Sequence, residues 1–551
     1  MRLSGMSLIA ARTFAESTGG AHILRQKVFR DYRIDALLDL PASARAPLEV
    51  HGGPLIQNRR RGWRGKGLEP PTASPHRSTG AALRQAYADK GLTPVDVLEA
   101  IGQRIDAEDF GEATFSPFCC LDLERANQAA EESMQRYRRG EPLGPLDGIP
   151  VPVKDQYLMK GLATKAGCTH LEHDAEQDAH FVKVLREAGA LLYAKTHTTE
   201  WGMNPCGFSP HVSMPRNVYS NQHSAGGSST GAAVAVALGM ATVGSGSDGG
   251  GSIRIPAAMN GIFGIKPTFI RIGRTGDFFG SSSVSTAGPL GASTTDLVDF
   301  LSVTATVDDP NDPTRRWAPR QRNLGQRWYR ALGRGIDGAR IGIPTGEWAD
   351  LDAPLQTPSM EALRELEKDG AELVEIEVPM MAHAPAIGVL SIGMETLANL
   401  QDECAECGDQ LSDELRMTLA MLSTISATEF LAAQRSRAAL KQVIRDTLDD
   451  VDLIALPTTR STASDYPLAL DGVPLADDEA IRSMTRFTFL ANITGLPAGT
   501  VPVGLHQNLP FGIQFVGGAW DEASVLAAMA HAERQQWTHL RQPMGCRALA
   551  T

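Results

Sequence analysis

Residues 226–276 read GGSSTGAAVAVALGMATVGSGSDGGGSIRIPAAMNGIFGIKPTFIRIGRTG, a run of small side chains with two loops rich in glycine and serine. From about residue 229 to 238 the sequence consists largely of Ala, Val and Gly. A helix that is apolar all round is a buried helix, and small side chains let it approach a sheet closely. The segment therefore predicts a helix inside an α/β core.

The two loops that bracket this helix, residues 226–231 and 244–252, point to chemistry. Glycine permits positive φ angles and lets backbone N–H groups approach a ligand. Three successive glycines, Gly249, Gly250 and Gly251, precede Ser252 and could aim several N–H groups at one point, as in a backbone oxyanion hole. A flexible turn or a phosphate cradle is the alternative. A P-loop is disfavoured because neither loop has the spacing G-x-x-x-x-G-K-[ST].

Strands alternate with helices on both sides of this stretch. A helix over 179–188 stands between two apolar segments, and a helical middle part of the chain is followed by further apolar segments. The expected buried strands lie at 148–155, 190–194, 451–457, 500–503 and 511–516. This order predicts the α/β class, with a large mixed, mostly parallel central sheet flanked by helices on both sides. Pro502 predicts an edge or strand-start position for its strand.

Composition and charge exclude several classes of protein. The 551 residues include 52 Lys and Arg against 64 Asp and Glu, a net charge of −12, which argues against a nucleic-acid surface. The basic run over 59–66 is interpreted as a solvated loop. A hydrophobic fraction of 42% excludes disorder of the whole chain. The acidic charge therefore predicts no nucleic acid as a partner. Because no apolar run reaches the roughly 18 residues of a membrane span, we also expect no membrane as a partner.

The cysteines indicate a reducing compartment. Seven cysteines, an odd number scattered over a long chain, do not form the pattern of a disulfide framework, so a cytoplasmic location is expected. Cys404 and Cys407 form a C-x-x-C pair, but no second pair and no histidine lies at the spacing of a zinc site. We therefore expect no metal and no organic cofactor.

Several motifs together resemble the amidase signature family of serine hydrolases. The strongest are GGSSTG and GSDGGGSIRIPAAMNGIFGIKPT within the stretch quoted above. Others are GPLDGIPVPVKDQ upstream, and DLIALPTT, NITGLPAGTVPVG and FGIQFVG downstream. The resemblance implies a catalytic domain over 79–540, an N-terminal extension over 1–78 and a C-terminal tail over 541–551. The extension is expected to be partly helical and to pack on the core or on a second protomer, which leaves a homodimer open.

The resemblance implies a Ser-cisSer-Lys triad of Lys154, Ser228 and Ser252, with a cis peptide bond between Gly227 and Ser228. A serine hydroxyl needs a base, and a lysine can serve only when burial lowers its pKa enough to leave it neutral. Ser252 would be the nucleophile, Ser228 the proton relay and Lys154 the base. His223, just upstream of the first loop, is a rival base without triad spacing.

The resemblance also gives supporting roles. The backbone N–H groups of residues 249–252 would hold the oxyanion, and Asp248, Arg254 and Ser229 would brace the loop; an ordinary buried ion pair is the alternative for the first two. Gly202 and Met203 are expected to border the substrate pocket.

The expected reaction is hydrolysis of the C–N bond of a small-molecule carboxylic amide, with esters or carbamates as further substrates. Thr230 replaces the usual glycine of GGSSGG, and GSDGGGS is similar to the subgroup that contains hydrolases of linear and cyclic amides. The glutaminase component of a tRNA-dependent amidotransferase is an alternative with the same triad. A non-catalytic scaffold is disfavoured because no triad residue is missing.

Overall fold

The computed structural model describes residues 2–17, 19–40, 53–55, 62–71, 77–278, 282–535 and 542–549. The arginines at 59–61 of the basic run and the side chain of Cys404 lie outside the described residues.

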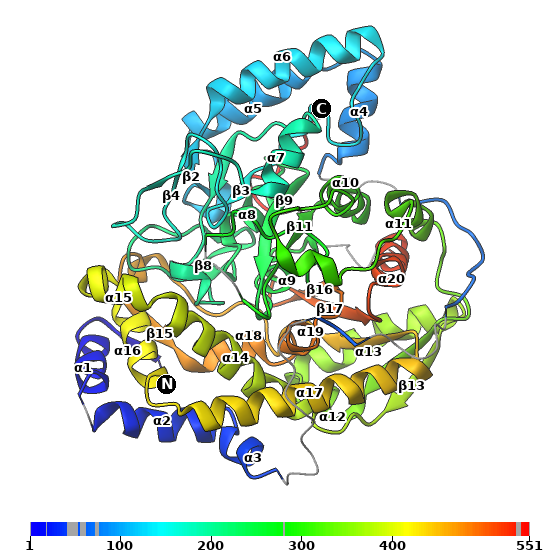
Figure 1. Ribbon diagram of the computed structural model, residues 1–551. Helices are drawn as coiled ribbons and strands as arrows, with labels where there is room; N and C mark the ends of the chain where they lie inside the picture. The colour runs from blue at the N-terminus through cyan, green and yellow to red at the C-terminus, as the bar shows by residue number, and fades with distance from the viewer. Residues whose placement is uncertain are drawn as a thin grey trace.

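A mixed sheet forms the centre of the molecule (Figure 1). Within the described residues it contains eight strands, in the order β13 (Glu372–Ile376), β12 (Arg340–Pro344), β14 (Leu453–Pro457), β17 (Leu509–Gly517), β16 (Ala498–His506), β10 (Phe263–Lys266), β11 (Thr286–Gly291) and β9 (Val243–Asp248). Strand β12 runs parallel to β13 and β14, whereas the other neighbouring pairs are antiparallel.

The expected mixed sheet flanked by helices is confirmed, but its strand directions are mostly antiparallel and not mostly parallel. The reason lies in the connections. Gln507 and Asn508, both with positive φ, join β16 to β17 in a tight hairpin, and such short links produce antiparallel neighbours. The edge position expected from Pro502 is also wrong, because β16 lies inside the sheet and a register shift beside Pro502 accommodates the missing N–H group.

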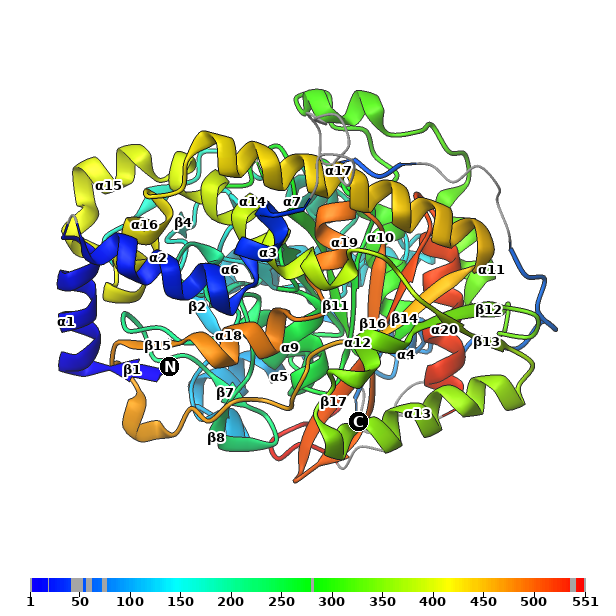
Figure 2. The same cartoon turned by 90° about the horizontal axis from the view of Figure 1, so that it is seen from below.

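Helices cover both faces of this sheet (Figures 1 and 2). Gly499 on β16 faces Met529 of α20 (Glu522–Arg534). Gly512 on β17 faces Ala258 of α9 (Arg254–Met259). Since Gly499 pairs with Phe515, which is three residues from Gly512, the two glycines point to opposite faces of the sheet.

A smaller sheet continues the large one at its β9 edge. It has the order β2 (Phe118–Leu121), β6 (Ala194–Thr196) and β3 (Val153–Lys154). The N–H of Ser245 on β9 donates to the carbonyl oxygen of Pro152, beside β3, at 3.1 Å. This contact brings the end of β3, and with it Lys154, next to the end of β9.

The apolar segment near residue 230 forms α8 (Thr230–Ala237), in which every residue is buried, as expected. The helix contacts β3, β6, β9 and β11. The expected helix over 179–188 is α7 (His180–Glu187), while β6 begins at the end of the predicted strand over 190–194.

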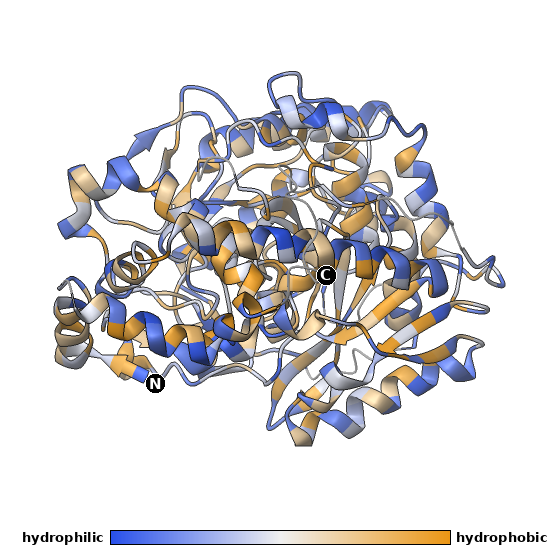
Figure 3. Cartoon of the chain, turned by 60° about the horizontal axis from the view of Figure 1, so that its bottom comes forward, coloured by the Kyte–Doolittle hydropathy of each residue, from blue (hydrophilic) through white to orange (hydrophobic). Residues whose placement is uncertain are grey.

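The remaining helices surround the central strands, which are largely hydrophobic, and most of them interleave hydrophilic and hydrophobic residues (Figure 3), whereas α19 (Phe489–Thr494) is buried throughout. The remaining helices are α4 (Gly80–Ala88), α5 (Pro94–Asp106), α6 (Leu123–Arg139), α10 (Thr294–Thr304), α11 (Leu324–Leu332), α12 (Thr345–Ala349), α13 (Ala353–Lys368), α14 (Ala384–Asn399), α15 (Gln401–Cys407), α16 (Asp413–Leu422), α17 (Ala427–Asp450), α18 (Asp478–Thr485) and α19. None of the helices in the described ranges is both long and apolar enough to cross a bilayer.

The N-terminal segment packs against the same chain. It contains β1 (Arg2–Ser4), α1 (Gly5–Ala15), α2 (Gly20–Asp31) and α3 (Ile34–Leu38). Strand β1 pairs with β15 (Leu475–Asp477), and α1 and α2 both contact α16. Phe29, Ile34 and Leu37 are buried in a core cluster with residues of α14 and α17. Figure 2 shows these helices, in dark blue, beside α16 and α18.

A buried ion pair fixes the loop that follows β9. Asp248 and Arg254 are both completely buried, with Nε to Oδ2 at 3.0 Å and Nη2 to Oδ1 at 2.9 Å. Arg254 also donates to Gln514 Oε1 on β17 at 2.7 Å and to Asn492 Oδ1 on α19 at 2.7 Å. Burial raises the pKa of the Asp248 carboxyl, but the charge and hydrogen bonds of Arg254 outweigh it and lower this pKa to about 2.

Removing one partner of this pair should destabilise the protein strongly. Arg254→Met leaves the Asp248 carboxylate buried without its cation, which typically costs about 3–5 kcal/mol of unfolding free energy. The matched control is Arg340→Met, since Arg340 pairs with Glu372 at the surface, where the side chains are 34% and 56% exposed. The control should lose at most about 1 kcal/mol. Urea unfolding of the two variants checks this, and equal losses would contradict it.

Candidate active site

Lys154 lies at the end of β3 and is completely buried. Its Nζ donates to Ser228 Oγ at 2.7 Å and to Ser247 Oγ at 2.7 Å. Burial lowers the pKa of Lys154 from 10.5 to about 7, although the charges of Asp277 and Asp248 raise it. A large fraction of this amine is therefore neutral near pH 7 and able to accept a proton.

Ser228 lies in the glycine-rich loop just before α8. The peptide bond between Gly227 and Ser228 is cis, as expected. The Gly227 N–H donates to the carbonyl oxygen of Pro205 at 2.7 Å, and this bond anchors the loop. Ser229 joins the two loops. Its N–H donates to the carbonyl oxygen of Ser252 at 3.2 Å, and its hydroxyl donates to the carbonyl oxygen of Ser247 at 3.2 Å.

Ser252 follows the three glycines and lies where two cavities meet. Ser252 is 8% exposed, whereas Ser228 is 1% exposed. Both serines line the smaller cavity, but no hydrogen bond joins their hydroxyls among the described contacts. The structure thus brings Lys154 and Ser228 into direct contact and places Ser252 on the same cavity as Ser228.

The three glycines before Ser252 differ in whether their backbone N–H group already donates a hydrogen bond within the protein. The N–H of Gly251 donates to Asp248 Oδ1 at 2.8 Å, so the expectation that Gly251 contributes to an oxyanion hole is wrong for this structure. In the described part of the chain, no acceptor is recorded for the N–H groups of Gly249, Gly250 and Ser252. Gly251 has φ +123°, and a Cβ on Gly250 would lie 2.7 Å from the Phe489 ring, so both positions require glycine.

The two cavities at Ser252 differ in size and lining. The larger has a volume of about 220 Å³ and a mostly apolar lining. The smaller has a volume of about 60 Å³ and includes several polar side chains. Gly202 and Met203, the residues expected at the substrate pocket, line both cavities.

His223, the rival base, lies away from this junction. It belongs to β8 (Ser220–Ser224), with Nδ1 at 2.8 Å from Ser220 Oγ and Nε2 at 3.4 Å from Asp465 Oδ1. It does not line either of the two cavities described above. The geometry therefore favours Lys154 over His223 as the base.

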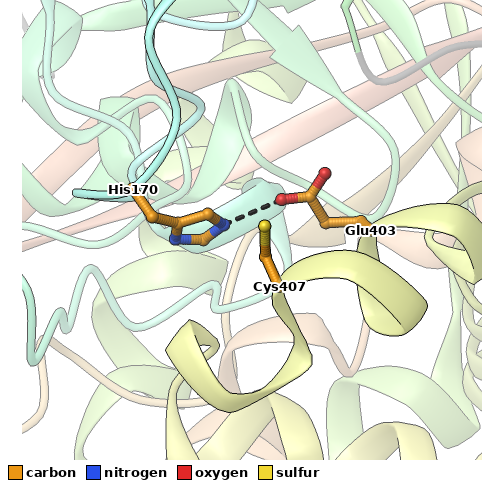
Figure 4. Close-up of side chains that lie close together, drawn as sticks. All are labelled: His170, Glu403 and Cys407. Carbon is orange, nitrogen blue, oxygen red and sulfur yellow. Dashed lines mark hydrogen bonds and ion pairs between the residues drawn. The ribbon is translucent and has the colours of Figure 1, made fainter.

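One group of possible metal ligands lies in a different place (Figure 4). His170, Glu403 and Cys407 bring their ligand atoms within 4.8 Å of one another, and His170 Nε2 is 2.8 Å from Glu403 Oε1. The expectation concerned histidines at the sequence spacing of a zinc site, and His170, more than 230 positions away in the chain, comes close to Cys407 only through the fold. None of the three lines the cavities at Ser252, and the contact of His170 with Glu403 joins two of them.

Sequence reasoning missed two further features of the site. Ser247 holds Lys154 and donates to Gln156 Oε1 at 2.5 Å; the only signal was its position directly before Asp248 in the glycine-rich motif. Leu24 and Val28, from the N-terminal helix α2, line the larger cavity, and no sequence signal links them to Ser252.

Comparisons with known proteins show the family of the chain. The model of the Amidase family matches residues 96–526. A fatty acid amide hydrolase of Arabidopsis thaliana is 33% identical over 81% of this chain and 74% of its own length. The A subunit of the glutamyl-tRNA(Gln) amidotransferase of Halorhodospira halophila is 31% identical over 82% of this chain and 96% of its own.

Solved structures have the same fold. The native peptide amidase of Stenotrophomonas maltophilia superposes with a TM-score of 0.70 at 28% identity, covering 85% of this chain and 98% of that one. A structure described as an amidase has a TM-score of 0.71 at 28% identity, covering 83% of this chain and all of that one. The chain therefore belongs to the amidase signature family and is an amidase.

Proposed function

We propose that the enzyme hydrolyses carboxylic amides through an acyl ester on Ser252, with Ser228 as proton relay and Lys154 as base. The observation that carries this proposal is the 2.7 Å contact between Lys154 Nζ and Ser228 Oγ in a completely buried setting. A lysine whose pKa is about 7 is matched to proton transfer near neutral pH.

In the first half of the reaction, Ser252 Oγ attacks the carbonyl carbon of the amide. Its proton passes to Ser228 Oγ, and the proton of Ser228 passes to the neutral Lys154 Nζ. The carbonyl oxygen becomes an oxyanion. The N–H groups of Gly249, Gly250 and Ser252 are the donors that can stabilise it, because Gly251 donates to Asp248.

In the second half, the C–N bond breaks. The proton returns from Lys154 through Ser228 to the leaving nitrogen, which departs as an amine, and Ser252 retains the acyl group as an ester. Water then attacks this ester and gives its proton to the same relay, which releases the carboxylic acid and restores Ser252. Esters and carbamates offer the same carbonyl carbon, so they are further candidate substrates.

A glutaminase that supplies a tRNA-dependent amidotransferase is the second candidate. It is favoured by the 31% identity to the amidotransferase component of Halorhodospira halophila. The mostly apolar lining of the larger cavity argues against it, because a glutamine side chain needs polar partners that an apolar site does not offer.

Loss of the nucleophile should abolish turnover. Ser252→Ala removes the attacking oxygen, so kcat/KM should fall at least about 10³-fold on every substrate of a panel. The panel comprises an aryl anilide, an aliphatic primary amide, a cyclic amide, a carbamate, an ester and glutamine. A matched control is Ser436→Ala, a buried serine on α17 whose hydroxyl donates to the Ala432 carbonyl, which should stay within about twofold.

Two results of this panel would change the assignment. Activity that survives Ser252→Ala would overturn the mechanism. Turnover of glutamine, with no turnover of the other amides, would favour the amidotransferase glutaminase.

The pH dependence of kcat/KM should follow the protonation of the Lys154 amine. Protonated Lys154 cannot accept the proton of Ser228, so kcat/KM should be constant well above pH 7 and fall about tenfold per pH unit below it. Lys154→Met should lose this activity. His223→Asn should keep the same acid limb, because His223 does not line the cavities. Steady-state rates from pH 5 to 9 check this. If the acid limb of the kcat/KM profile disappeared in His223→Asn, the base would be His223 instead of Lys154.

A further inference from the structure

The two cavities that meet at Ser252 suit different halves of an amide. They share Ser252, Gly202, Met203 and Ile392 in their linings. The smaller cavity, of about 60 Å³, is lined by polar groups that include Gln156, Asp277, Glu395 and Asn399. The larger, of about 220 Å³, is mostly apolar. An amide bond at Ser252 therefore has a small cavity with many polar side chains on one side and a larger, more apolar cavity on the other.

The proton relay decides which half enters which cavity. In the proposed mechanism the leaving nitrogen receives its proton from Ser228, so this nitrogen has to lie beside Ser228. Ser228 lines the smaller cavity and is not among the residues that line the larger one in the described part of the chain. The amine half thus occupies the small polar cavity, and the acyl half extends into the large apolar cavity.

The large cavity is enclosed in part by the N-terminal segment. Apolar side chains from α14, α16, α18 and α19 line it, together with residues of β1 and α2 and the residue that follows α2. The N-terminal contributors are Leu3, Leu24, Lys27, Val28 and Tyr32. Residues of β1 and α2, with Tyr32, therefore supply one wall of the cavity that Ser252 also lines.

Ion pairs fix this wall in place. Lys27 on α2 pairs with Asp31 at 2.7 Å and also with Asp478 on α18. Arg482 on α18 pairs with Asp31 at 2.9 Å. On α1, Arg12 lies 3.2 Å from Asp413 of α16. The N-terminal helices are thus attached to two of the elements that form the rest of the cavity.

The charged groups within the lining are compensated. Lys27 and Asp478 neutralise each other. Burial raises the pKa of the Glu414 carboxyl to about 8, so this group is mostly uncharged at pH 7, and it accepts hydrogen bonds from the Asn204 amide. Glu200 accepts hydrogen bonds from Ser412 and lies 2.9 Å from His211 Nε2. An apolar acyl group therefore meets little uncompensated charge.

We propose that β1, α2 and Tyr32 form the chain-length-selecting wall of an acyl pocket, and that the enzyme prefers amides of extended apolar carboxylic acids with a small polar amine half. This inference rests on the proposed function, since it takes Ser252 as the nucleophile and Ser228 as the proton donor to the amine.

A series of unbranched primary amides, from two to ten carbons, tests the wall by ammonia release. For the wild type, kcat/KM should rise roughly fourfold with each methylene that becomes buried, until the cavity is full. Leu24→Trp should end this rise at a shorter chain and lower the ratio of kcat/KM for the longest amide to kcat/KM for acetamide at least tenfold. The matched control is Ile23→Trp, because Ile23 neighbours Leu24 but is 57% exposed; its profile should equal that of the wild type.

A second variant keeps the test valid where Leu24→Trp fails to fold. Val28→Ala enlarges the cavity and should move the optimum to a longer chain. Flat dependence on chain length in the wild type, or identical profiles for the wild type, Leu24→Trp and Val28→Ala, would overturn the inference while leaving amide hydrolysis intact. Failure of the proposed function looks different: none of the amides is turned over, and a fluorophosphonate does not label Ser252.

Discussion

The buried pair of Asp248 and Arg254 is the interaction on which the arrangement of the site depends. It joins the end of β9 to the start of α9, and through Gln514 and Asn492 it reaches β17 and α19. The same carboxylate accepts the Gly251 N–H, so the turn that carries Ser252 is held by a charge that cannot move without leaving an unpaired ion in the core. Four elements, β9, α9, β17 and α19, thereby fix the position of the Ser252 hydroxyl.

The site contains two buried ionisable groups, Asp248 and Lys154, whose charge states differ. Asp248 accepts hydrogen bonds on both carboxylate oxygens and stays ionised, whereas among the described residues Lys154 has two hydroxyl partners and no hydrogen-bonded carboxylate. Desolvation therefore dominates at Lys154 and favours the neutral amine. The proton relay proposed above depends on this difference, because only a neutral amine can accept a proton.

Much of the site could be predicted from the sequence, because Lys154, Ser228 and Ser252 lie in motifs and the helix over 230–237 has an unmistakable composition. Other features depend on the path of the chain. Strand direction depends on loops such as the two-residue turn at Gln507 and Asn508, and the donor role of Gly251 depends on the orientation of one peptide. The contacts of α2 with the cavity join segments almost four hundred residues apart, and no local pattern encodes such contacts.

The pairing of β1 with β15 has a consequence for the order in which the enzyme is made. Leu3 pairs with Ala476, which is synthesised more than 470 residues later, after roughly 25–95 s at usual elongation rates. The apolar sides of α1 and α2 have no partner from α16 until residue 422 has been made, and none from α18 until residue 485 has been made. The nascent chain therefore has to keep these helices from aggregating while several hundred further residues are translated, and the cavity beside Ser252 is enclosed only after α18 has been made.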